Sequence, residues 1–208
     1  MGVRWGALGD VGCFSFYDNK IVTTGEGGML ASKDPAVAER ARSPRNYGMD
    51  PKRRYWHLEI GLNYRMTNIR ATIGCAQMDR IDEILARKRR IARRYADELH
   101  EVPGLTLAPC APWAESVYWM YSVLVEDGLG MERDQVMAEL RALGIDTRPF
   151  FVPIYRLPPY RSSVTLPVSD RLSARGINLP SGNGFTEEQV GIVTAALRAI
   201  SRSGGKQG

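Results

Sequence analysis

The chain has little of what metal centres and disulfide scaffolds require. It contains only two histidines, His57 and His100, and three cysteines, at positions 13, 75 and 110. An odd number of widely spaced cysteines indicates reduced thiols rather than a disulfide framework. No CxxC pair is present, and we therefore expect neither a structural zinc site nor another bound metal.

Long hydrophobic runs are also missing. No apolar stretch approaches the ~20 residues needed to cross a bilayer, and no basic-then-apolar signal peptide opens the chain. Both absences predict a cytoplasmic protein without a membrane partner. The 208 residues, 44% hydrophobic and 25% charged, are enough for a sizeable core in one or two domains.

Acidic residues are outnumbered by basic ones, which raises the question of a nucleic-acid partner. The net charge is +5, and much of the excess lies in residues 87–94, within a long helical pattern. Ile84, Ile91, Tyr95 and Leu99 form one apolar stripe of that pattern. We interpret the basic run as a solvated helix face and expect no nucleic-acid binding. The alternative, a nucleic-acid patch, predicts a steeply salt-dependent affinity for DNA.

Apolar periodicity and turn residues predict the main elements. The patterns indicate strands at 11–16, 29–31 and 118–125, an extended segment at 145–151, and helices at 35–42, 67–102, 133–143, 168–175 and 186–200. Residues 67–102 are expected to form one long helix, with a kink left open, and 43–66 a functional loop. Thr186 and Gln189 have capping-box spacing, and 201–208 are expected to be frayed.

A lysine in a short polar break carries most of the functional information. Lys20 lies between two strand-like runs, 11–16 and 29–31, with Ser15 upstream and glycines in 25–28. A lysine presented by a strand end and partly withdrawn from water is suited to forming a Schiff base. The serine and the glycines would allow close approach to a phosphate. The pattern suggests a pyridoxal-phosphate site; the alternative is a solvated lysine beside an ordinary turn.

This stretch resembles the lysine motif of the DegT/DnrJ/EryC1/StrS sugar aminotransferases. That motif reads roughly G-D-hydrophobic-x-x-F-S-F-x-x-x-K-x-hydrophobic-x-x-G-E-G-G. The matching residues are Gly9, Asp10, Phe14, Ser15, Phe16, Lys20, Gly25, Glu26, Gly27 and Gly28. The resemblance continues to about Leu197 and so covers nearly the whole chain.

The resemblance implies an α/β fold of the aspartate-aminotransferase type and transfer of an amino group by pyridoxal 5'-phosphate. The implied donor is L-glutamate and the acceptor a nucleotide-linked 4-keto-6-deoxy sugar. Lys20 would be the catalytic, cofactor-bearing residue, and Ser15 would contact the cofactor phosphate. Some relatives carry histidine at the lysine position and perform dehydration, so lysine favours transamination.

A second signature implies a dimer with shared active sites. Residues 61–68 resemble the family pattern G-x-N-Y-R-M-[ST]-N. By that resemblance Asn63 reaches the phosphate of the neighbouring subunit's cofactor, and Arg65 faces the active site to bind substrate. Without the family, Asn63 would be a turn residue and Arg65 a surface charge.

Other stretches narrow the expected substrate. Residues 55–57, 147–153 and 175–181 resemble the GDP-perosamine synthases, which makes GDP-4-keto-6-deoxymannose the first choice of substrate. Tyr155 stands where many relatives have histidine, in a region that often borders the substrate pocket. It is therefore a candidate substrate-binding residue, and it leaves the sugar preference open.

The resemblance also implies that half of the parent enzyme is absent. Family members are roughly twice this length, and their first half supplies the phosphate-binding turn, the aromatic that stacks on the cofactor and the aspartate that pairs with its ring nitrogen. We expect 1–108 to be the C-terminal part of the large domain, and 109–208 a small α/β domain.

The missing half should leave apolar side chains uncovered. We expect Phe14, Phe16 and Met29 to be exposed, because the part of the large domain that would cover them is absent.

Two further functions stay open: a 3-keto sugar aminotransferase of natural-product biosynthesis, and an inactive fragment that acts only through subunit association.

Overall fold

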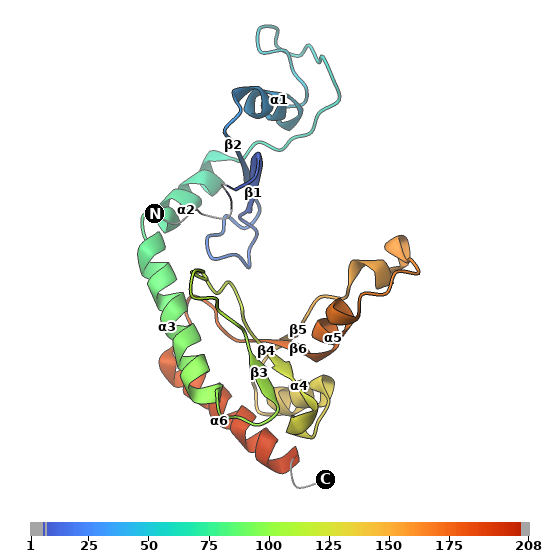
Figure 1. Cartoon of the computed structure of the whole chain (residues 1–208). Helices are drawn as coiled ribbons and strands as arrows, with labels where there is room; N and C mark the ends of the chain where they lie inside the picture. The colour runs from blue at the N-terminus through green and yellow to red at the C-terminus, as the bar shows by residue number, and fades with distance from the viewer. Residues whose placement is uncertain (1–5, 7, 205–208) are drawn as a thin grey trace. The chain divides into compact units, whose positions relative to one another are not determined.

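The computed structural model describes residue 6 and residues 8–204, and the chain divides into two compact units (Figure 1). The first unit runs to Ile81 and the second begins at Asp82. No helix in the described part of the chain is long and apolar enough to span a membrane. The expected division at residue 108 into two parental domains stays a prediction.

The first unit is built on a β-hairpin. Strands β1 (Val11–Ser15) and β2 (Gly28–Ser32) pair antiparallel, with Ser15 opposite Gly28 at the end of the register. Both strands were predicted from the apolar runs. The connection between them carries Lys20.

Part of the hairpin's apolar surface is uncovered within the described structure. Phe14 and Met29 are 44% and 58% exposed, which confirms the expectation for these two side chains. The third, Phe16, is half-buried and so departs from the expectation; its backbone bonds to Gly27 and Thr24, where the lysine loop closes.

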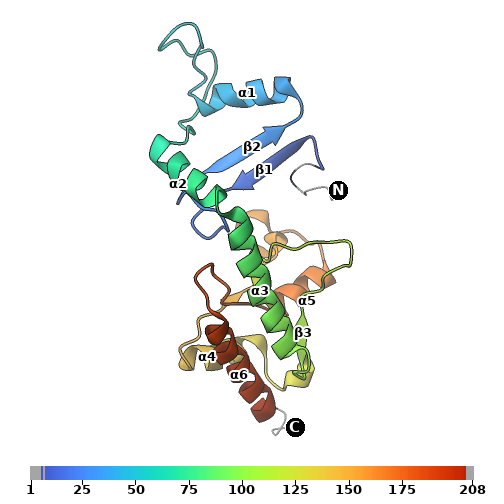
Figure 2. The ribbon, with the colours of Figure 1, turned by 90° about the vertical axis from the view of Figure 1, so that its left-hand side faces the viewer.

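Helix α1 (Pro35–Arg45) follows the hairpin and contacts β2 (Figure 2). Its start is set as expected: the Asp34 carboxylate accepts the N–H of Ala36, and proline occupies the first turn. The helix ends at Arg45, one turn later than expected. The segment that follows is a loop, as predicted, closed by the isolated bridge between Asn46 and Asn63.

The expected helix over 67–102 is interrupted. It consists of α2 (Asn68–Met78) and α3 (Ile81–Leu99), separated by a turn at Asp79 and Arg80. The kink that the sequence left open is therefore a full interruption of two residues, and the expected helix is present as two helices. Neither glycine nor proline marks the break, and the apolar period shows no interruption on either side, so local sequence rules could not locate it.

A four-stranded antiparallel sheet organises the second unit. Its order is β3 (Leu105–Leu107), β4 (Tyr121–Val125), β6 (Gly176–Leu179) and β5 (Arg148–Pro149). Of the extended segment expected at 145–151, only the two residues of β5 pair. The strands β3 and β6 are too short for their alternation to stand out in the sequence.

Three helices complete the second unit: α4 (Arg133–Ala142), α5 (Pro167–Arg175) and α6 (Glu187–Gly204). The capping box before α6 is present, since Thr186 Oγ1 accepts the N–H of Gln189 and Gln189 Oε1 accepts the N–H of Thr186.

The end of α6 differs from the expectation of a frayed tail. The helix continues to Gly204, with Ser201 buried and its hydroxyl donating to the carbonyl of Pro103. The expectation is therefore wrong for residues 201–204, because tertiary contacts hold this turn. Residues 205–208 lie outside the described part of the chain.

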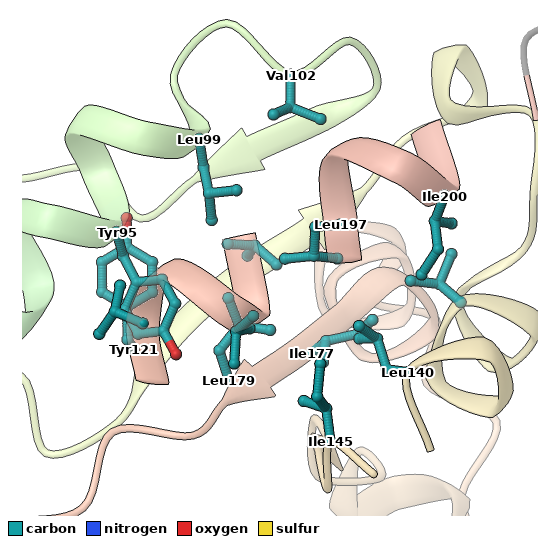
Figure 3. Close-up of a cluster of buried hydrophobic side chains, with 14 of the residues drawn as sticks. Tyr95, Leu99, Val102, Tyr121, Leu140, Ile145, Ile177, Leu179, Leu197 and Ile200 are labelled. Carbon is teal, nitrogen blue, oxygen red and sulfur yellow. The ribbon is translucent and has the colours of Figure 1, made fainter. Parts of the chain in front are cut away.

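The core of the second unit lies between α3, α6 and the sheet (Figure 3). Ile91, Tyr95 and Leu99 on the predicted stripe of α3 are all buried. The rings of Tyr95 and Tyr121 stack with centroids 4.8 Å apart. Every second residue of β4 is buried as well, so an alternating strand and an amphipathic helix share one core.

The basic run of α3 is more than a solvated face, contrary to the interpretation from sequence. Lys88 is buried, and its Nζ donates to the carbonyl of Trp119 at 3.1 Å and to that of Ser181. Burial lowers the pKa of Lys88 to about 8. Arg87 and Arg89 donate to further loop carbonyls. The run therefore holds two loops of the second unit against α3.

Candidate active site

Lys20 lies in a loop whose two legs are joined at Phe16. The Phe16 carbonyl accepts the N–H of Thr24 at 2.9 Å and the hydroxyl of Thr23 at 3.2 Å. Within the loop the N–H of Lys20 donates to the carbonyl of Tyr17 at 3.0 Å, and Lys20 is half-buried. The sequence expectation of a lysine on a short, constrained connection after a strand agrees with this geometry.

Ser15 closes β1 immediately before the loop. Its Oγ accepts the N–H of Tyr17 at 3.3 Å, and the residue is exposed. A hydroxyl that accepts from the backbone still has its own proton to donate. A hydroxyl donor at the end of β1 and an amine on the loop that follows are a donor set suited to a phosphorylated aldehyde cofactor.

The glycine turn after the loop is required by packing within the protein. A Cβ on Gly27 would lie 2.6 Å from Thr24 Oγ1 and 2.8 Å from Met66 Cε. Thr24 is itself buried, and its hydroxyl donates to the carbonyl of Glu26 at 2.9 Å. The turn therefore packs tightly against Thr24 and Met66, and this packing requires glycine at position 27, where the sequence predicted a close approach to a phosphate.

Asn63 and Arg65 lie together on the loop that follows α1. Asn63 bridges to Asn46, and the Arg65 Nη1 donates to the Oδ1 of Asn46 at 3.3 Å. Both Asn63 and Arg65 are exposed. A Cβ on Gly61 would lie 2.2 Å from the nitrogen of Gly48, so the two legs of this loop can meet only at glycine. The loop carries an exposed amide and an exposed guanidinium two residues apart, and both groups can donate hydrogen bonds to an anionic ligand.

Tyr155 belongs to the second unit, and its hydroxyl is engaged. The hydroxyl hydrogen-bonds to Asp170 Oδ1 at 2.7 Å, and Arg156 Nη2 lies 2.7 Å from the same oxygen. Burial, and then the hydrogen bond to the ionised Asp170, raise the pKa of the Tyr155 phenol. Tyr155 therefore ties its short 3₁₀ turn (Ile154–Arg156) to α5 through its hydroxyl. A ligand would contact the aromatic ring of Tyr155 rather than its hydroxyl.

The Tyr155 side chain also lines a pocket of about 720 Å³ in the second unit. The pocket lies among residues 116–122, residues 150–155 and α5. Its aromatic lining residues are Tyr118, Trp119, Phe150, Phe151 and Tyr155. Such a volume with aromatic walls and a few polar groups suits a small organic ligand.

The four candidate residues of the first unit fall on two segments: Ser15 and Lys20 on the end of β1 and the loop after it, Asn63 and Arg65 on the loop after α1. Sequence reasoning missed the supports of the lysine loop, Thr24 and Gln77. Gln77 lies on α2, and its amide binds the backbone of Thr23. A glutamine on a helix looks like an ordinary polar surface residue, so nothing in the local pattern distinguished it.

Comparison with known proteins identifies a single family over nearly the whole chain. The model of the DegT/DnrJ/EryC1/StrS aminotransferase family matches residues 1–198. The chain is 45% identical over 202 residues to the GDP-perosamine synthase of Caulobacter vibrioides, covering 96% of this chain and 54% of that protein. It is 35% identical to the putative pyridoxal phosphate-dependent aminotransferase EpsN of Bacillus subtilis, covering 94% and 52%.

Structural comparison agrees with the sequence matches. The crystal structure of the aminotransferase TlmJ from Streptoalloteichus hindustanus matches with a TM-score of 0.90 at 32% identity, covering 97% of this chain and 55% of that one. The expected aspartate-aminotransferase-type α/β fold is thereby confirmed. The chain spans about half the length of the curated relatives it matches.

Proposed function

We propose, because the chain belongs to the DegT/DnrJ/EryC1/StrS aminotransferase family, that it forms the lysine-bearing part of a nucleotide-sugar aminotransferase. The observation that carries the proposal is the position of Lys20, half-buried on a closed loop that directly follows β1 and its last residue, Ser15. Because the family consists of aminotransferases, we assign the transfer of an amino group to the site that contains Lys20. We keep the cytoplasmic location expected from the sequence as part of the proposal.

The cofactor of this proposal is pyridoxal 5'-phosphate. The name of the Bacillus subtilis relative supports it, and so does the donor set at the end of β1 and on the loop after it. When bound, this group withdraws electrons from the substrate carbon that gains or loses the amino group. Lys20 is assigned to covalent attachment of the cofactor and, once released, to moving a proton at that carbon. Ser15 is assigned to the phosphate through its free hydroxyl proton.

The proposed substrate is a GDP-linked 4-keto-6-deoxy sugar, with L-glutamate as amino donor. Support comes from the GDP-perosamine synthase at 45% identity, a higher value than the 35% found for EpsN. The glutamate assignment follows from the family resemblance. We assign Tyr155 to the sugar side through its ring, because its hydroxyl is held by Asp170.

The proposed assembly is a homodimer in which each site uses residues of both subunits. Asn63 is assigned to the phosphate of the cofactor in the other subunit, and Arg65 to the substrate. The exposure of both side chains on a loop closed by the Asn46 bridge is compatible with a role at a subunit contact.

The test maps the lysine that reacts with the cofactor. The chain is loaded with pyridoxal 5'-phosphate, reduced with borohydride and digested, and the pyridoxyl group is located by mass spectrometry. We expect the adduct on the peptide that contains Lys20. The matched control is Lys33→Ala, which should leave the adduct in place, while Lys20→Ala should remove it. An adduct spread over Lys33 and Lys52, with none on Lys20, would overturn the proposal.

A further inference from the structure

One helical side chain holds the lysine loop from outside. The Gln77 amide on α2 makes two hydrogen bonds to the backbone of Thr23: Oε1 accepts the N–H at 3.1 Å, and Nε2 donates to the carbonyl at 2.6 Å. Thr23 lies three residues after Lys20. The amide therefore pairs with the loop backbone as a neighbouring strand would.

The orientation of this amide is itself fixed. Nε2 also donates to the carbonyl of Ile73, one turn earlier on α2, at 3.1 Å. Because both hydrogens of Nε2 then have acceptors, the oxygen must face the N–H of Thr23. Gln77 is half-buried, so these bonds compete less with water than bonds on an open helix surface do.

The helix and the loop also touch through small groups. A Cβ on Gly74 would lie 3.0 Å from the Cγ2 of Thr24, and Thr24 is only 5% exposed. One turn of α2 thus meets the loop at two adjacent residues, through packing at Thr24 and through hydrogen bonds at Thr23. The same two residues bond to Phe16, where the loop closes.

From these contacts we infer that Gln77 is a positioning residue for Lys20. It fixes the C-terminal leg of the lysine loop to α2, while β1 fixes the N-terminal leg. Lys20 is thereby held between two rigid elements rather than on a free turn, and a supported reactive group keeps its geometry. The inference rests on the proposed function of Lys20.

The first experiment measures the support directly, without cofactor. Amide hydrogen exchange is recorded on the 208-residue chain and on Gln77→Leu, Gln77→Glu and Arg70→Leu. In Gln77→Leu the Thr23 N–H loses its acceptor, and we expect its exchange to become roughly tenfold faster. Gln77→Glu keeps the acceptor for the Thr23 N–H but replaces the donor that faces the Thr23 and Ile73 carbonyls with a second acceptor, so it should retain only part of the protection. Arg70→Leu, a polar-to-leucine change on an exposed position of the same helix, should change nothing at Thr23.

The second experiment asks whether the support matters for Lys20. The same four chains are reduced in the presence of pyridoxal 5'-phosphate, and labelling of Lys20 is compared with labelling of Lys33. We expect the ratio to fall about fivefold in Gln77→Leu, to recover partly in Gln77→Glu and to stay unchanged in Arg70→Leu. A purely structural role would leave the ratio unchanged while Thr23 exchange rises.

The outcomes separate the inference from the proposed function. Absence of any Lys20 label in the unsubstituted chain contradicts the proposed function. Strong Lys20 labelling that is unaffected by Gln77→Leu, with faster Thr23 exchange, overturns the positioning role alone. If Gln77→Leu loses exchange protection throughout α2, the comparison moves to Gln77→Glu, and an unchanged labelling ratio there, with faster Thr23 exchange, also overturns it.

Discussion

At the scale of single residues, the sequence predicted candidate side chains for the chemistry but missed those that support the lysine loop and the second unit. Lys20 and Ser15 were predicted from a lysine between two strands; Ser15 ends β1, and Lys20 lies on the loop that follows. Gln77 and Lys88 were not predicted, because each acts through backbone carbonyls that only the fold brings near. A contact between a side chain and a distant main chain leaves no pattern in local sequence.

Lys88 should make stability depend on pH. Its pKa is about 8 in the folded chain against an ordinary value of 10.5, because burial disfavours the charge. Between these pH values the unfolded chain binds more protons, so the free energy of unfolding should rise with pH. Relative to Lys88→Met, the free energy of unfolding of the unsubstituted chain should rise by about 1–3 kcal/mol over this pH range. The increase is less than burial alone would give, because the two carbonyls partly favour the charged form.

The measurement is chemical denaturation of both chains from pH 7 to 10.5. Burial also raises the pKa of Tyr95 and Tyr121, but both chains share those groups, so their effect cancels in the difference. Curves for the two chains that stay parallel across this range would show that the Lys88 ammonium has no altered proton affinity in the fold.

At the scale of elements, starts of helices were predicted more reliably than ends. Asp34 and Thr186 cap their helices as expected, because a cap depends on a few adjacent residues and can be identified from local sequence. No such local signal marks the break between α2 and α3, and the last turn of α6 depends on tertiary contacts. Ser201, for example, is held through the Pro103 carbonyl, about a hundred residues away.

The capping box of α6 should contribute measurably to stability. Thr186→Ala removes the hydroxyl that accepts the Gln189 N–H, and should lower the free energy of unfolding by about 1 kcal/mol. Val190 and Leu197 of this helix are buried in the core, so fraying is transmitted to the second unit. Thermal unfolding monitored by circular dichroism measures the loss. Thr165→Ala, on an exposed loop, is the control, and an equal effect in both variants would speak against the cap.

At the scale of the whole molecule, the chain spans about half the length of the curated relatives it matches. Its second unit nevertheless has a core of buried hydrophobic side chains. Helix α3 supplies a third side of that core through Ile91, Tyr95 and Leu99. The first unit differs, since Phe14 and Met29 remain exposed on its hairpin. The sequence predicted this difference from the resemblance, whereas the boundary between units depends on where α3 packs, which periodicity alone does not reveal.

The second unit should therefore require α3 for its stability. We expect a fragment of residues 82–204 to unfold cooperatively, and a fragment of residues 109–204 to lose cooperative unfolding. The shorter fragment lacks β3 as well as Ile91, Tyr95 and Leu99 of α3, three large buried side chains that are each worth about 2–5 kcal/mol. Near-ultraviolet circular dichroism during thermal unfolding makes the comparison. Equal midpoints for the two fragments would show that α3 is dispensable for this core.

The central claim is that this chain carries the catalytic lysine of a nucleotide-sugar aminotransferase. The most direct test adds the part of a relative's sequence that this chain does not cover. A chimaera joins the part of the Caulobacter vibrioides GDP-perosamine synthase that the chain does not cover to this chain, with Lys20 or with Lys20→Ala. Transfer of the amino group from L-glutamate to GDP-4-keto-6-deoxymannose is then measured. We predict turnover with Lys20 and a loss of at least about a hundredfold with Lys20→Ala. A folded, cofactor-binding chimaera that transfers no amino group, or that works equally well without Lys20, would contradict the account.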